Sequence, residues 1–172
     1  MENAPEYLLT TCEVALGFTG FASLLLALAP RGSTPPAVYR FRIYSLLTGS
    51  LGALFLALLS LAFLAFGVQE ITTWRWSSAV MAIVAASSLV FAVPLTERAR
   101  RESADWLSPN RAVLVLLLLG TPVNIVVQSL NAVLVFAPPF PVYFVGLVGF
   151  LFYAAIGLVQ MVIAAVEGKS AA

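Results

Sequence analysis

The chain contains no histidine among its 172 residues, and Cys12 is its sole cysteine. This composition excludes disulfide frameworks, zinc sites built from cysteine and histidine, histidine-ligated haem and every acid or base that uses histidine. A reactive thiol needs an exposed, electropositive setting. We therefore interpret Cys12 as a small packing residue near one end of a helix, and we expect neither a metal nor a cofactor.

Charged residues are also scarce, because they make up only 10% of the chain, whereas about 25% is usual in soluble domains. Hydrophobic residues account for 61%, and the mean hydropathy is +0.99. A soluble domain of this size could not bury so much apolar surface. The 9 basic and 8 acidic residues give a net charge of +1, which offers no electrostatic case for nucleic acid as a partner.

Long runs without any charged residue indicate membrane spans. These runs are Val14–Pro30, Ile43–Gln69, Trp76–Thr96 and Ala112–Val166. Roughly 20 apolar residues in a helix cross a bilayer core. A single helix through the last run would be about 80 Å long, so the prolines at 138, 139 and 141 predict a tight reversal within it.

The sequence thus predicts an all-α, polytopic transmembrane bundle, with residues 1–172 forming a single domain. Its five predicted spans lie near residues 7–30, 42–67, 76–96, 111–136 and 142–166. A competing interpretation treats Ala27-Leu28-Ala29 as a signal-peptidase site. Against this, the N-terminal segment has no basic residue and carries Glu2 and Glu6.

Basic residues predict the orientation, since short cytoplasmic loops are enriched in lysine and arginine. With five spans, one side of the membrane receives only Arg75. The other side receives Arg31, Arg40, Arg42, Arg98, Arg100, Arg101, Arg111 and Lys169. We therefore expect the N-terminus outside and the C-terminus inside, with lipid as the immediate partner.

Glu13 is the only formal charge that we place inside the hydrocarbon region. An ionisable group at the centre of a membrane helix costs about 2.5 kcal/mol or more, so it is expected to face the bundle interior and to have a partner. Two interpretations remain open. Glu13 is either a structural, hydrogen-bonded or snorkelling carboxyl group, or part of a path for an ion, proton or substrate.

The predicted fourth span carries a polar stripe, formed by Thr121, Asn124, Gln128 and Asn131 at helical spacing. Counted from the outer ends of the spans, Gln128 and Asn131 reach about the depth of Glu13. We therefore predict a hydrogen bond between Glu13 and one of these two amides, because an unsatisfied amide is costly in hydrocarbon. Arg75 is the alternative partner of the carboxylate.

Glycines recur at helical spacing in three of the predicted spans. Such small-residue faces allow two membrane helices to approach closely. The candidates for helix packing are Gly17, Gly20, Gly49, Gly52, Gly146, Gly149 and Gly157.

Four short segments resemble a group of small bacterial multi-pass inner-membrane proteins whose first helix carries a glutamate followed by glycine and phenylalanine. The segments are Cys12–Phe21, Tyr39–Arg42, Leu46–Ala53 and Tyr143–Leu147. The resemblance implies a bacterial inner-membrane location and assigns no catalytic or binding residue.

Two classes of function follow. The first is a non-enzymatic structural or assembly subunit that oligomerises or binds other membrane proteins. The second is a channel or transporter that conducts a cation or proton past Glu13 and the polar stripe. We do not expect an enzyme, because the predicted spans lack paired acids and bases at bonding distance.

Overall fold

The computed structural model describes residues 3–27, 37–102, 111–133 and 135–166. Helix is the only regular secondary structure in these ranges. The five helices are α1 (Ala4–Ala27), α2 (Ala37–Ala65), α3 (Glu70–Glu102), α4 (Arg111–Ala132) and α5 (Pro139–Val166). The predicted all-α class is confirmed.

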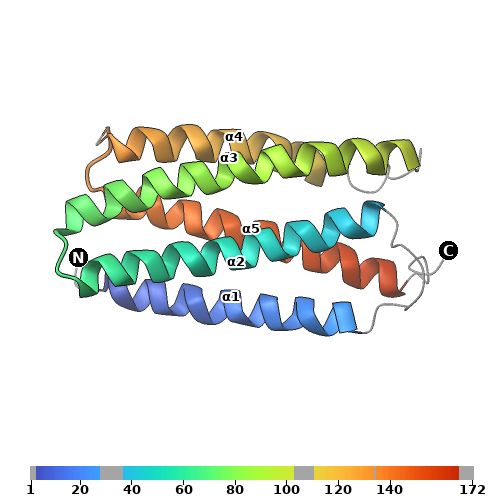
Figure 1. Ribbon diagram of the computed structural model, residues 1–172, viewed down its shortest axis with the longest axis horizontal. Helices are drawn as coiled ribbons and strands as arrows, with labels where there is room; N and C mark the ends of the chain where they lie inside the picture. The colour runs from blue at the N-terminus through green and yellow to red at the C-terminus, as the bar shows by residue number, and fades with distance from the viewer. Residues whose placement is uncertain (1–2, 28–36, 103–110, 134, 167–172) are drawn as a thin grey trace.

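The helices lie side by side, with successive helices running in opposite directions (Figure 1). α2 and α5 occupy the middle of the bundle and pack on each other. α1 packs on α2 and α5 along one side, and α3 and α4 pair on the other side. α4 reaches the rest of the bundle through α3 and α5.

Four of the described helices are long and apolar enough to cross a membrane. They are Ala4–Ala27, Tyr39–Ala65, Glu70–Arg98 and Pro139–Ile163. α4, whose described side chains begin at Leu118, is not among the four. The protein is therefore a multi-pass membrane protein built as a helical bundle.

The helices extend beyond several of the predicted spans. α3 covers Glu70–Glu102 where residues 76–96 were predicted, because the apolar pattern marks only the part suited to hydrocarbon. Its charged end continues as helix, and Arg101 pairs with Glu97 one turn earlier at 3.3 Å. Of the competing signal-peptidase segment, Leu28 and Ala29 lie outside the described residues.

The two short reversals are built differently. Gly67 ends α2 with a positive φ of 74°, and the amides of Gly67 and Val68 donate to the carbonyls of Leu64 and Phe63. This is a Schellman cap, which favours glycine. After α4 the chain reverses before Pro139, which already belongs to α5, because the first helical turn tolerates proline.

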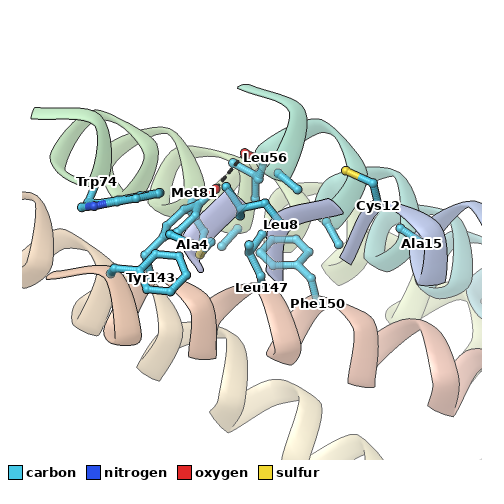
Figure 2. Close-up of a cluster of buried hydrophobic side chains, with 14 residues drawn as sticks. Ala4, Leu8, Cys12, Ala15, Leu56, Trp74, Met81, Tyr143, Leu147 and Phe150 are labelled. Carbon is cyan, nitrogen blue, oxygen red and sulfur yellow. Dashed lines mark hydrogen bonds between the residues drawn. The ribbon is translucent and has the colours of Figure 1, made fainter. Parts of the chain in front are cut away.

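The main core includes Ala4 and Leu8 and so lies toward the end of the bundle where α1 begins. Figure 2 shows its side chains. Leu8 of α1, Leu56 of α2, Met81 of α3 and Leu147 of α5 are fully buried there. Cys12 is buried in the same cluster, in agreement with its interpretation as a packing residue. Lipid is as apolar as leucine, so close packing and hydrogen bonds between helices must hold this core together.

Most basic residues of the described chain lie at one end of the bundle, where Glu97 and Glu102 accompany them. The antiparallel order puts the start of α2, with Arg40 and Arg42, beside the end of α3, with Arg98, Arg100 and Arg101. We call this the arginine end. Glu6, Glu70 and Arg75 lie near the opposite end.

Candidate functional site: a polar-lined cavity between the helices

The polar stripe of α4 faces the other helices. Asn131 is completely buried, and its Nδ2 donates to Ser78 Oγ and to the Pro139 carbonyl, each at 2.9 Å. One side chain thereby joins the end of α4 to α3 and to the first turn of α5. In hydrocarbon such bonds between helices satisfy polar groups that water cannot reach.

Gln128 lies one turn earlier and is 1% exposed. Its Nε2 donates to the Val142 carbonyl of α5 at 2.9 Å. Gly146 makes this approach possible, because a Cβ on residue 146 would collide with the Gln128 amide and with Met81 Sδ. The glycine is required by the position of the amide.

A cavity of about 290 Å³ lies between the middle parts of α2, α3, α4 and α5. This volume is close to the lower limit of about 300 Å³ for small-molecule sites. Its walls include Val123, Val145 and Phe152, whose side chains are more than half exposed on the outside of the bundle. The cavity therefore opens toward the outside of the bundle, between α4 and α5.

Polar side chains line part of the cavity. They are Thr48, Ser88, Thr121, Asn124, Gln128 and Tyr153. Three of the six belong to the stripe predicted from the sequence. None of the lining residues is charged.

Two amide oxygens of the stripe have no hydrogen-bond partner within the described part of the chain. They are Gln128 Oε1 and Asn131 Oδ1, and both are buried. Asn124 lines the cavity half-buried, and the described residues provide no hydrogen bond to it. Unpaired amide groups cost free energy in an apolar setting, so this region keeps an unused capacity for hydrogen bonding.

Glu13 does not join the stripe. It lies on the exposed side of α1, and α1 packs on α2 and α5 rather than on α4. The predicted hydrogen bond with Gln128 or Asn131 is therefore wrong. The similar depths of Glu13, Gln128 and Asn131 could not reveal this difference. Depth specifies a position along the membrane normal but not the direction in which a helix face points.

Arg75 is exposed on α3 and does not contact Glu13. Its Nε donates to the Ala132 carbonyl at 3.0 Å. A cation at the C-terminus of α4 satisfies a carbonyl that has no partner within the helix and complements the helix dipole. The side chain thus caps α4, a role that the sequence analysis did not assign.

The predicted packing glycines divide into two sets. Gly49, Gly52, Gly146 and Gly157 lie against neighbouring helices so closely that a Cβ would meet atoms at 3.0 Å or less. Gly17, Gly20 and Gly149 have nothing within 4 Å of that position. Spacing alone does not separate the two sets, because both kinds of glycine face follow the same helical period.

A second polar cluster, missed in the sequence analysis, lies in the core. The Tyr143 hydroxyl donates to the Leu56 carbonyl at 2.8 Å, a bond that is dashed in Figure 2. Ser60 Oγ lies 2.8 Å from both the Tyr143 oxygen and Ser77 Oγ, so α2, α3 and α5 meet here. One feature of the sequence could have predicted this cluster. Tyr143 lies in an apolar run, and a buried tyrosine hydroxyl usually finds a hydrogen-bond partner.

Comparisons with known proteins identify no family. No protein-family model, no curated protein and no solved structure matches the chain. The chain is a helical protein in which four of the described helices are long enough to cross a membrane.

Proposed function

We propose that this protein is a non-enzymatic assembly subunit of a bacterial inner membrane, and that it forms a homo-oligomer through the outward face of α1. The N-terminus lies outside and the arginine end lies in the cytoplasm, in keeping with the distribution of basic residues. The observation that carries the proposal is the exposure of Glu13 on a helix of membrane length.

The face around Glu13 suits a contact between helices. Gly17 and Gly20 follow Glu13 at helical spacing and are exposed, and a Cβ added to either would meet nothing within 4 Å. Glycines let another backbone approach, which supplies packing in a solvent that offers no hydrophobic driving force. A carboxylate left in lipid is costly, so the face gains most from a partner that brings hydrogen-bond donors or positive charge.

Arg75 of a second copy meets that requirement. Arg75 is exposed on α3, whereas Glu13 is exposed on α1. α3 and α4 lie on one side of the bundle and α1 lies on the other (Figure 1). Arg75 gives one donor to Ala132, and a guanidinium carries five N–H donors in all. A contact between two different faces is head-to-tail and closes into a ring when the rotation permits.

The two side chains can reach the same level. Tyr7 and Trp74 both contact the Phe140 ring, at centroid distances of 6.4 and 4.7 Å, so these two residues lie at similar depth. Glu13 lies six residues further along α1 than Tyr7, which is about 9 Å. The Glu13 side chain tilts toward the N-terminus of α1, which shortens the gap. Since α3 runs in the same direction as α1, Arg75 must turn its long stem away from the N-terminus of α3 to close the rest.

A conducting pathway finds less support. Such a pathway within one copy requires Glu13 and the α4 stripe to share one surface. Glu13 is absent from the residues that line the cavity and lies on another side of the bundle. The amides also make bonds between helices, which is the structural use of polar groups in membrane bundles.

An exchange of charges tests the assembly. We would reconstitute the wild type, Glu13→Arg, Arg75→Glu and the double variant in lipid nanodiscs or vesicles, and count subunits by single-molecule photobleaching. Each single variant should weaken association by about tenfold or more, because it puts like charges together, and the double variant should restore it.

Glu6→Arg provides the matched control, since Glu6 is an exposed acid on the same helix but near its end. It should assemble like the wild type. A wild-type protein that stays monomeric in lipid, or a double variant no better than either single one, would contradict the proposal.

A further inference from the structure

We infer that the cavity beside α4 binds a neutral, lipid-like molecule that carries a hydroxyl group, and that this molecule enters sideways from the hydrocarbon region between α4 and α5. The inference is independent of the assembly proposed above. It depends on the lining of the cavity, its opening and the unpaired amide groups beside it.

The opening determines how a ligand arrives. The cavity is lined by residues from the first half of α5, such as Val145 and Phe152, which are exposed where lipid surrounds the bundle. A molecule dissolved among acyl chains reaches this opening without crossing the headgroup region. Gly120 and Gly149 leave the opening of the cavity unobstructed. A Cβ added at either position would meet nothing within 4 Å.

The lining determines the charge and shape of the ligand. Val127, Phe150 and similar residues form apolar walls, and no charged side chain lines the cavity. An ionic headgroup would therefore lose its hydration without gaining a counter-ion. Neutral molecules with a slender or flat apolar body fit such walls.

The amides determine the polar group of the ligand. Asn124 lines the cavity and makes no hydrogen bond with the described residues, and Gln128 Oε1 is unpartnered one turn further along α4. An amide offers both donors and an acceptor. A hydroxyl also donates and accepts, so it complements Asn124 better than an ether, which only accepts.

Photolabelling tests this inference. The probe is a long-chain alcohol that carries a diazirine, added to the full-length protein in nanodiscs, with labelled peptides mapped by mass spectrometry. Labels should concentrate on the parts of α4 and α5 that line the cavity. Unlabelled long-chain alcohol should compete about fivefold better than its methyl ether, because one additional hydrogen bond raises the affinity by about that factor.

Two variants act on the site in different ways. Asn124→Leu removes the polar group without breaking a described hydrogen bond, so alcohol and ether should then compete equally. Gly149→Leu adds a side chain where space is open, and it should lower labelling about tenfold if the cavity is the site. Ala86→Leu, at an exposed position of α3 that does not line the cavity, should label like the wild type.

The opposite results are equally clear. Equal competition by alcohol and ether in the wild type would mean that the cavity holds water or acyl chain and would overturn the inference. Labels spread evenly over exposed helix faces, including that of α1, would also overturn it.

Discussion

Gly49 of α2 lies directly against the backbone of Phe150 in α5. A Cβ on residue 49 would lie 2.6 Å from the Phe150 carbonyl oxygen and 2.7 Å from the Ala154 amide nitrogen. Neither backbone atom can move without shifting α5. The close packing of α2 on α5 therefore requires glycine at position 49, because the methyl group of an alanine would not fit there.

Gly49→Ala should accordingly destabilise the protein, by about 1–3 kcal/mol, the usual cost of overpacking. The measurement is unfolding in mixed micelles by titration with a denaturing detergent, followed by circular dichroism. Gly149→Ala is the matched control, because its Cβ would meet nothing within 4 Å. A Gly49→Ala protein as stable as Gly149→Ala would contradict the described contact.

Tyr143→Phe should weaken the core without changing its shape. The variant loses the bond to the Leu56 carbonyl and the contact with Ser60 Oγ, which join α5 to α2. We expect a loss of about 1 kcal/mol, since hydrogen bonds between membrane helices are worth little more than this. Tyr7→Phe, at an exposed tyrosine of α1, should leave stability unchanged in the same assay.

The proposed orientation predicts which residues a membrane-impermeant maleimide reaches in intact cells. Cys12 is buried, so an added cysteine supplies the signal. Gln69→Cys, in the turn before α3, should react from outside. Arg100→Cys, at the arginine end, should react only after the cells are permeabilised. The reverse pattern would place the N-terminus in the cytoplasm and refute the assignment.

Vesicles that contain the purified protein should leak cations and protons no faster than empty vesicles. The reason is that Glu13 and the α4 stripe lie on different sides of one copy, so they do not form one pathway. Glu13→Gln should behave like the wild type in a pH-sensitive dye assay. A wild-type leak that disappears in Glu13→Gln would instead favour the channel interpretation.

The sequence was sufficient to predict the bundle because the solvent restricts the choices. Every backbone polar group in hydrocarbon needs a partner within the protein, so long apolar runs must form helices. The same reasoning required partners within the protein for the α4 amides, and Gln128 and Asn131 are buried, although their partners lie on α3 and α5 and not at Glu13. Helix ends were less predictable, since hydropathy marks the membrane rather than the end of a helix.

The position of Glu13 shows where prediction from the sequence ends. Its depth followed from counting residues, and the cost of an intramembrane charge favoured an inward direction. Neither argument specifies the rotation of α1 about its axis. That rotation follows from packing, because Leu8, Cys12 and Ala15 occupy the buried side of α1 and leave Glu13 on the exposed side.

The sequence by itself therefore determined that lipid surrounds this protein and that its apolar runs form helices. It also determined which helix carries the polar stripe. All of these depend on local composition and on the free energy of transfer into lipid. Only the tertiary structure decided which faces meet: that Gly49 contacts Phe150, that Arg75 caps α4, and that a cavity lies beside Asn124. Lipid and protein interior are equally apolar, so hydrophobicity cannot choose between helix faces, and close packing and hydrogen bonds make that choice.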